Sequence, residues 1–92
     1  MKDIKIKVVG PQNPCKRCKA TKSVVEEAVH QHFTSAQQEH ITITHVDVSA
    51  PETIEAYGLL DTPAVVINDT IVSEGEIPKT DYIKRKLLEF HE

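Results

Sequence analysis

Two strand patterns separated by one long helical pattern constrain the fold of this chain most strongly. In residues 4–9 isoleucine or valine alternates mostly with lysine, which is typical of a half-buried strand. Residues 41–48 show a second strand pattern, rich in isoleucine, threonine and valine. Between them, at about 14–34, apolar side chains recur at helical spacing. The positions expected to face the core are Cys18, Thr21, Val25, Ala28, Val29 and Phe33. Strand, helix and strand predict a βαβ unit with a parallel pair of strands.

The segments on either side of the second strand differ in character. Residues 35–40 are polar and are expected to form a connector. The run from Ser49 to Glu52 resembles a capping box, which predicts the start of a short helix. Gly58 is the expected C-terminal stop of that helix.

The last third of the chain predicts a hairpin followed by a helix. Residues 64–67 are continuously apolar and are expected to form a third strand. Residues 68–69, Asn-Asp, suit a two-residue hairpin turn, so that residues 70–73 pair back as a fourth strand. Gly75 ends this strand, and a final helix is expected from Pro78 to about Phe90. The predicted order is βαβ, short helix, ββ, α.

Composition limits the class of protein. Ninety-two residues support one domain with one small core, and we expect residues 1–92 to form it. The 11 basic and 14 acidic residues give a net charge of −3, which does not favour nucleic acid or an anionic membrane as partner. The N-terminus lacks the apolar stretch of a signal peptide, and no segment approaches transmembrane length. We therefore expect a monomeric, cytoplasmic protein in which disulfides are transient and catalytic.

The only two cysteines, Cys15 and Cys18, lie where the first strand gives way to the helix. At this spacing in a first helical turn their side chains face the same way, so small adjustments close a disulfide. Pro14 suits the first turn of a helix. The positive end of the helix dipole, with Lys16 and Arg17 beside it, favours a thiolate and lowers the pKa of Cys15. Cys15 is then the attacking thiolate and Cys18 the resolving thiol.

Metal binding is the alternative use of the two thiols. A structural zinc site needs four ligands. His30 and His32 do not complete one, because twelve helical residues, about 18 Å at a rise of ~1.5 Å per residue, separate Cys18 from His30. The two histidines also point to nearly opposite sides of a helix, and we expect both to be solvated. A two-thiolate site for a soft metal or metalloid, such as Cu(I) or As(III), remains open.

Thr62-Pro63 is the second notable motif. Proline is tolerated at the first position of a strand, so by itself the pair is an ordinary strand start with a trans bond. Its importance depends on whether it lies against the cysteines. Three carboxylates, Asp47, Asp61 and Glu76, could lie near the site, and we expect Asp47 and Glu76 to be exposed turn or strand-end residues instead.

Together these motifs resemble the thioredoxin/glutaredoxin superfamily. The resemblance rests on CxxC after the first strand, Thr62-Pro63 before the third, the hairpin, and the run from Gly75 to Pro78 that enters the final helix. It covers nearly the whole chain. Length and strand order look most like the small redox-active disulfide thioredoxin-like proteins of archaea and bacteria, which are glutaredoxin-sized.

The resemblance implies a thioredoxin-like α/β fold, βαβαββα, with a four-stranded mixed sheet flanked by helices. It implies that Pro63 is cis and packs against the disulfide, and that the backbone of Thr62 pairs with an extended segment of the substrate. Cys15 is by this resemblance the nucleophile and Cys18 the resolving thiol. The residues expected to line the substrate groove are Pro14, Lys16, Arg17, Thr62, Pro63 and Gly75.

The expected activity is thiol–disulfide exchange on protein disulfides, with no cofactor besides the Cys15–Cys18 disulfide and no metal. The partners would be those disulfides and a reductase or small-thiol reductant. The chain departs from thioredoxins in having no Trp and no carboxylate in the first strand, and Gly75-Glu76 matches the glutathione-holding motif of glutaredoxins only in part. The physiological reductant therefore stays open. A soft-metal thiolate module and a non-catalytic interaction domain are the competing functions.

Overall fold

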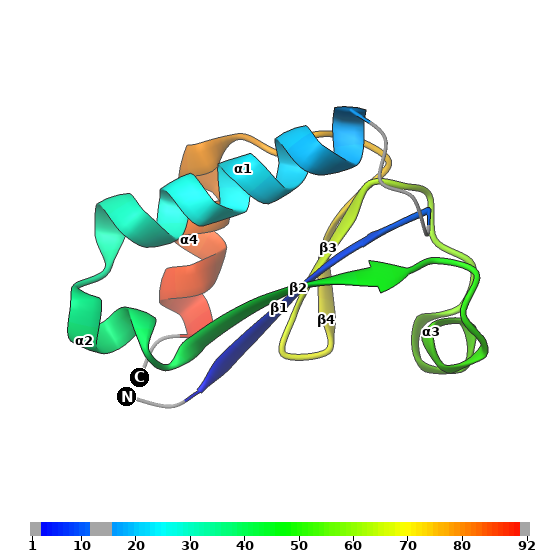
Figure 1. The fold of residues 1–92 in the computed structure, drawn as a ribbon, viewed down its shortest axis with the longest axis horizontal. Coiled ribbons are helices and arrows are strands. Elements are labelled where there is room, and N and C mark those ends of the chain that lie inside the picture. Colours follow the sequence, from blue (N-terminus) through cyan, green and yellow to red (C-terminus); the bar gives the residue numbers. More distant parts are fainter. Residues whose placement is uncertain (1–2, 12–15, 91–92) are drawn as a thin grey trace.

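A computed structural model describes residues 3–11 and 16–90 of the chain. Its elements, in chain order, are β1 (Ile4–Gly10), α1 (Lys16–His32), α2 (Ser35–Gln38), β2 (Ile41–Asp47), α3 (Pro51–Tyr57), β3 (Ala64–Ile67), β4 (Thr70–Glu74) and α4 (Thr80–Phe90). Figure 1 shows their arrangement around one sheet.

The four strands form a single mixed sheet in the order β2-β1-β3-β4. β1 and β2 are parallel and in register from the Ile4–Ile41 pair to the Gly10–Asp47 pair. The other two pairings, β1 with β3 and β3 with β4, are antiparallel. The predicted βαβ unit and the mixed four-stranded sheet are therefore confirmed.

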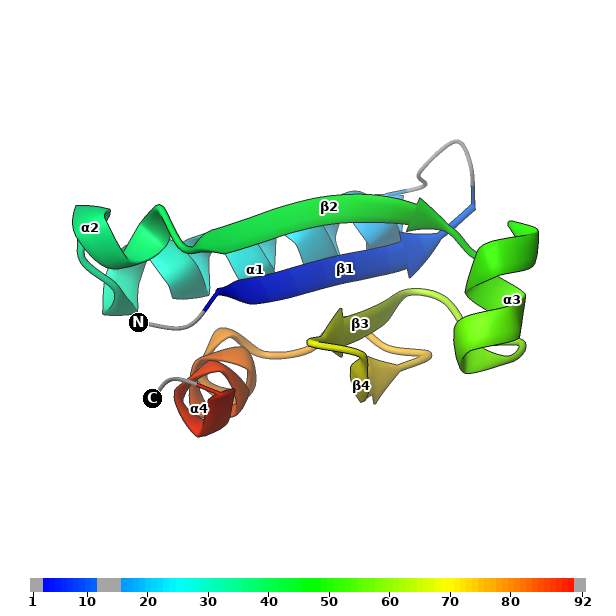
Figure 2. The same cartoon turned by 90° about the horizontal axis from the view of Figure 1, so that it is seen from below.

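The main core lies between the sheet and the two long helices, α1 and α4 (Figures 1 and 2). All six positions predicted to face the core from the long helix are at most 5% exposed; five lie in α1 and Phe33 directly follows it. Ile83 and Leu87 of α4 are fully buried against them. The spacing of apolar residues along these helices thus decides which helix face meets the sheet.

A smaller apolar cluster lies on the opposite face of the sheet. Val9, Ala64 and Val66 are buried there, and half-buried Tyr57 and Leu60 pack against them. α3 lies at this end of the sheet (Figure 2). Because this cluster buries Val9 on the opposite face, the alternation of burial along β1 ends in three consecutive buried residues, Val8, Val9 and Gly10.

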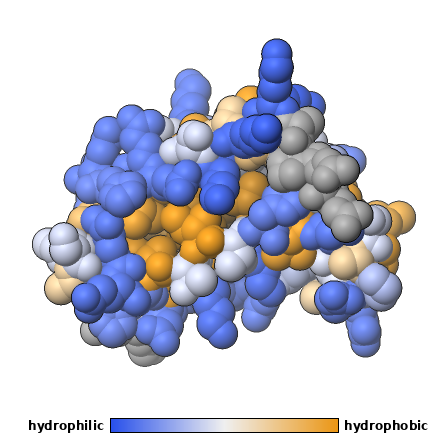
Figure 3. Space-filling model, viewed as in Figure 1, coloured by the Kyte–Doolittle hydropathy of each residue, from blue (hydrophilic) through white to orange (hydrophobic). Residues whose placement is uncertain are grey.

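The surface carries charged and polar side chains over most of the face in Figure 3, with an apolar strip beneath α1 in that view. Val24 of α1 and Ile41 and Ile43 of β2 are half-buried and pack against the core. The core therefore reaches the surface beside β2, an edge strand of the sheet.

The hairpin turn is the one that the sequence predicts. Asn68 and Asp69 both have positive φ, 48° and 66°, the backbone region that two-residue hairpin turns require. Asn68 also ties the turn to β1, because its Oδ1 accepts a hydrogen bond from the Lys5 N–H at 2.8 Å. A bulge between Val65 and Val66 shifts the register of β3 against β4.

Two predictions about helix starts are wrong. The expected polar connector contains helix α2, because the Thr34 hydroxyl accepts a hydrogen bond from the Gln37 N–H and the Gln37 side chain accepts one from the Thr34 N–H. No such box opens α3: its N-cap is Ala50, which makes no side-chain cap, and Pro51 is its first residue. Ser49 instead donates two hydrogen bonds to the Asp47 carboxylate.

The remaining boundaries differ by a few residues. α1 ends at His32, two residues before the expected end, and α4 begins at Thr80 instead of Pro78. β4 extends one residue further, to Glu74. Gly58 caps α3 with φ 77°, as predicted. Within the described residues, no helix is long and apolar enough to cross a membrane.

Candidate functional site

Cys18 lies in the first turn of α1 and is only 2% exposed. It faces the end of β1, where the chain leaves the sheet. Pro14 and Cys15 lie outside the described residues. The predicted pairing of Cys15 with Cys18 therefore stays a prediction, while the burial of Cys18 is a feature of the fold.

Gly10 provides the space that Cys18 occupies. A Cβ at Gly10 would lie less than 3.0 Å from Cys18 Sγ and 3.5 Å from Cys18 Cβ. Real Cβ atoms do not approach sulfur so closely, so only glycine lets the helix start pack this tightly on the strand end. The carbonyl of Gly10 also accepts a hydrogen bond from the Val48 N–H at 2.8 Å, which anchors the end of β1 to the chain beyond β2.

Arg17 links the start of α1 to the loop that follows β4. Its Nη2 donates a hydrogen bond to the Gly75 carbonyl at 2.9 Å. The Gly75 N–H in turn donates to the carbonyls of Asp61 and Pro63, both at 3.0 Å. Three predicted site residues, Arg17, Pro63 and Gly75, are thus joined by consecutive hydrogen bonds although they come from distant parts of the chain.

Thr62 and Pro63 lie just before β3. The peptide bond between them is cis, as the resemblance implied, and Pro63 is buried while Thr62 is half-buried. The described residues make no backbone hydrogen bond with Thr62. Lys16, the other predicted groove residue, is exposed at the start of α1. Whether Pro63 packs against a disulfide depends on Cys15 and stays a prediction.

His45 lies beside this site and was missed by the sequence analysis. Its Nε2 atom is 3.6 Å from the position that a Cβ would take at Gly10. Cys18 Sγ lies less than 3.0 Å from the same point, so the sulfur and Nε2 are no more than about 6.6 Å apart. This Nε2 atom is buried and has no hydrogen-bond partner among the described residues.

The signal for His45 was its place in the strand. Ile41, Ile43 and His45 alternate along β2, and the two isoleucines pack against the core under α1. A strand places every second side chain on the same face. His45 therefore points to the face of the sheet that carries Cys18. Because its side chain is polar, the pattern of apolar residues did not include it.

The carboxylates near this end of the sheet have other roles or lie in solvent. Asp47 accepts hydrogen bonds from the Ser49 N–H at 2.9 Å and the Ser49 hydroxyl at 2.8 Å. These bonds hold the pKa of Asp47 below its ordinary value. Glu74 accepts a hydrogen bond from the Asp61 N–H at 2.9 Å, which fixes the loop before Pro63. Glu76 is exposed, as expected.

A second polar cluster lies on the opposite face of the sheet. Lys7 Nζ donates to the Tyr57 hydroxyl at 3.0 Å, and that hydroxyl donates to Asp69 at 2.6 Å. The ammonium also lies 3.8 Å from the Asp69 carboxylate and 5.4 Å from the centre of the Tyr57 ring. The hydrogen bond with Tyr57 is the main reason that the pKa of Lys7 is raised. We call these three residues the lysine cluster.

A metal site within the described residues would need a cluster of side chains that could bind the ion. No three His, Cys, Asp or Glu side chains within residues 3–11 and 16–90 are grouped so as to hold a metal ion. His30 is exposed, as expected, and His32 is half-buried. Because Cys15 lies outside the described residues, the absence of a metal at the two cysteines stays a prediction.

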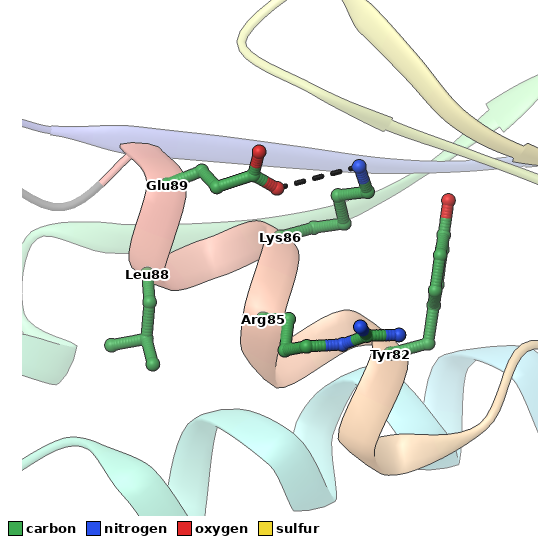
Figure 4. A pocket seen from close by; sticks show the side chains of 5 residues that line it. All are labelled: Tyr82, Arg85, Lys86, Leu88 and Glu89. Carbon is green, nitrogen blue, oxygen red and sulfur yellow. Dashed lines mark ion pairs between the residues drawn. The ribbon is translucent and has the colours of Figure 1, made fainter.

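A shallow hollow on α4 is lined by Tyr82, Arg85, Lys86, Leu88 and Glu89 (Figure 4). Lys86 and Glu89 form an ion pair at 3.3 Å, and both Arg85 and Lys86 lie within 6 Å of the Tyr82 ring centre. The Tyr82 hydroxyl donates to the Val72 carbonyl at 2.6 Å. These side chains are engaged with one another, which suits a solvated helix face better than a site of reaction.

The fold is shared with solved structures of low sequence identity. The oxidised thioredoxin of Plasmodium falciparum is 16% identical, with a TM-score of 0.62 over 99% of this chain and 84% of that one. A protein of unknown function from Staphylococcus aureus is 18% identical, with a TM-score of 0.65 over 100% of this chain and 96% of that one. At such identities the likeness concerns the fold. The fold class is therefore confirmed as thioredoxin-like.

The sequence itself also places the chain. No curated protein sequence matches it. Residues 4–88, however, match the family model described as a thioredoxin domain. This range begins with β1 and ends within α4, so it includes CxxC, Thr62-Pro63 and Gly75. The chain therefore belongs to the thioredoxin-domain family.

Proposed function

We propose that this protein is a thiol–disulfide oxidoreductase that acts on protein disulfides through Cys15 and Cys18. The observation that carries the proposal is the position of Cys18, buried at the start of α1 and packed against Gly10. A thiol that is 2% exposed is out of reach of a disulfide on another protein. Cys15 is then the nucleophile that attacks the substrate disulfide, and Cys18 attacks in the second, intramolecular step.

The chemistry is two successive exchanges. The Cys15 thiolate attacks one sulfur of the substrate disulfide, forms a mixed disulfide and releases the other substrate sulfur as a thiolate. Cys18 then attacks Cys15 Sγ, so that the Cys15–Cys18 bond forms and the second substrate thiolate leaves. Two electrons pass from the enzyme dithiol to the substrate. An external dithiol or reductase restores the reduced enzyme.

The surroundings of the motif support a protein substrate. Thr62 precedes β3 and its backbone has no hydrogen-bond partner among the described residues, so an extended segment can pair with it. Arg17 and Gly75 fix the neighbouring loops relative to the start of α1. Lys16 leaves positive charge at the surface beside the motif, which favours the thiolate of Cys15.

Reduction of insulin disulfides tests the proposal, with dithiothreitol as the dithiol that regenerates the enzyme. We expect turnover by the wild type, none above background for Cys15→Ser, and a trapped mixed disulfide on Cys15 for Cys18→Ser. Equal rates for wild type and Cys15→Ser would refute the enzymatic role.

A further inference from the structure

We propose that His45 accepts the proton of the Cys18 thiol when Cys18 resolves the mixed disulfide. This inference rests on the proposed function and adds a proton acceptor from β2 to its second step. Resolution needs the Cys18 thiolate, because a thiolate is the nucleophile in disulfide exchange. Burial of Cys18 disfavours the charged form, so a nearby base is needed at the moment of attack.

The position of His45 meets this need. Its Nε2 lies no more than about 6.6 Å from Cys18 Sγ, across the open side of Gly10. A proton can pass between the two groups through one bridging water. Nε2 is buried without a partner among the described residues, and in the neutral ring with its proton on Nδ1 this atom is an acceptor. The Thr53 and Ser73 hydroxyls are also buried without a partner among the described residues, so the closeness of Nε2 to Cys18 is what distinguishes His45.

Among the described residues, the groups shown around His45 do not offer a competing base. β1 contributes Gly10 and the apolar Val8, the direct partner of His45 in the sheet. Asp47 on the same strand interacts electrostatically with His45, but its carboxylate is hydrogen bonded to Ser49. Cys18 is the titratable side chain that α1 directs to this point.

The Cys18 thiol gives its proton to His45 Nε2, and its sulfur attacks Cys15 Sγ in the mixed disulfide. The Cys15–Cys18 bond forms while the bond from Cys15 to the substrate sulfur breaks, and that sulfur leaves with the electron pair as a thiolate. The proton on the His45 imidazolium then passes to solvent or to the departing thiolate.

The aromatic disulfide DTNB separates the two exchanges in one experiment. One equivalent is mixed rapidly with pre-reduced protein, and each release of nitrothiobenzoate is followed by its absorbance. The first release reports attack by Cys15 and the second reports resolution by Cys18. For His45→Gln we expect the first rate to stay within about twofold and the second to fall at least about tenfold at neutral pH. The second rate should then rise with pH as the thiol ionises by itself.

His30→Gln is the matched control, because it removes an exposed histidine of α1 and should leave both rates unchanged. If both rates of His45→Gln equal those of the wild type, the inference is overturned. A different outcome marks failure of the proposed function: a wild type that never releases the second nitrothiobenzoate has no resolving thiol, with or without His45.

Nuclear magnetic resonance gives a second test that retains His45. In Cys15→Ser, the ¹⁵N resonance of His45 Nε2 should show an inflection as Cys18 ionises. That inflection should vanish in Cys15→Ser/Cys18→Ala. A resonance that follows the same pH curve in both variants would contradict a proton path between the two groups.

Discussion

The two faces of the sheet carry polar side chains in opposite ways. In the lysine cluster, each polar group of Lys7, Tyr57 and Asp69 has a partner from another of the three residues. On the α1 face, His45 Nε2 is buried beside Cys18 with no partner among the described residues. A satisfied cluster fixes the hairpin to the sheet, whereas an unsatisfied buried atom costs stability. The Thr53 and Ser73 hydroxyls are also buried without a partner among the described residues, so only its closeness to Cys18 sets His45 apart. The difference separates a structural region from a reactive one.

Gly10→Ala should give the largest effect, because the new Cβ overlaps Cys18 Sγ. Overpacking of this kind costs about 1–3 kcal/mol of folding free energy. It should also displace the start of α1 and slow resolution of the mixed disulfide. Denaturant unfolding and the two DTNB rates measure both effects.

Gly58→Ala is the matched control for this substitution. Its φ of 77° strains any other residue, but the added Cβ meets nothing within 4 Å. We expect it to lower stability with no effect on either thiol rate. If Gly10→Ala also left both rates unchanged, the contact between Gly10 and Cys18 would have no part in the reaction.

Tyr57→Phe tests the other face. It removes the hydroxyl that joins Lys7 to Asp69, at an expected cost of about 0.5–1.5 kcal/mol. The raised pKa of Lys7 should fall back toward 10.5, since the hydrogen bond with Tyr57 is its main cause. A raised lysine pKa stabilises the fold below pH 10.5 and loses this contribution as the pH rises through the folded value. The variant should therefore have a lower free energy of unfolding than the wild type at neutral pH, while both DTNB rates stay unchanged. If Tyr57→Phe changed either DTNB rate, the lysine cluster would take part in the reaction and would not be purely structural.

Arg17→Ala should cost less stability, about 0.5 kcal/mol, because its hydrogen bond to Gly75 is exposed. Its larger effect should be on protein substrates, whose KM should rise while the rate with DTNB changes little. Lys16→Ala, which removes a neighbouring charge without that hydrogen bond, is the control. Equal KM values for the two variants would mean that charge, and not the link to Gly75, is what Arg17 contributes.

Ser49→Ala should have the smallest effect and is visible mainly in its pH dependence. The Ser49 N–H and hydroxyl both hold the pKa of Asp47 below its ordinary value of 3.8, and the variant loses only the hydroxyl bond, the smaller of the two causes. A lowered carboxyl pKa stabilises the fold above that ordinary value and loses this contribution as the pH falls through the folded value. Wild type and variant should thus differ in unfolding free energy at neutral pH and converge in acid. A carboxyl titration of Asp47 that is identical in both proteins would contradict this assignment.

The sequence predicts the fold better than the site. Regular spacing identified the buried face of α1, because burial along a helix is periodic. The turn at Asn68 followed from its residue types, since Asn and Asp tolerate the positive φ of a two-residue hairpin turn. Helix α2 was missed although Thr34 and Gln37 have capping-box spacing, since the apolar pattern had already ended. The predicted capping role of Ser49 was wrong because Ser49 donates its hydrogen bonds to the nearby Asp47 carboxylate.

The position of His45 beside Cys18 and the Arg17–Gly75 hydrogen bond are contacts that local sequence patterns cannot predict. Each joins residues that are distant in the chain, and each depends on the register of the sheet or the path of a loop. The strand period places His45 on the α1 face only once β2 is known to lie beside β1. Its proximity to Cys18 further requires that residue 10 be glycine.

The central claim is that Cys15 and Cys18 form a reversible redox couple. The direct measurement is equilibration with graded ratios of reduced and oxidised dithiothreitol, followed by alkylation of remaining thiols and mass spectrometry. We predict one transition in which both cysteines change together, with a tenfold change in equilibrium ratio for about 30 mV, as for two electrons. Cysteines that remain alkylatable under fully oxidising conditions, or that oxidise one at a time, would contradict the account.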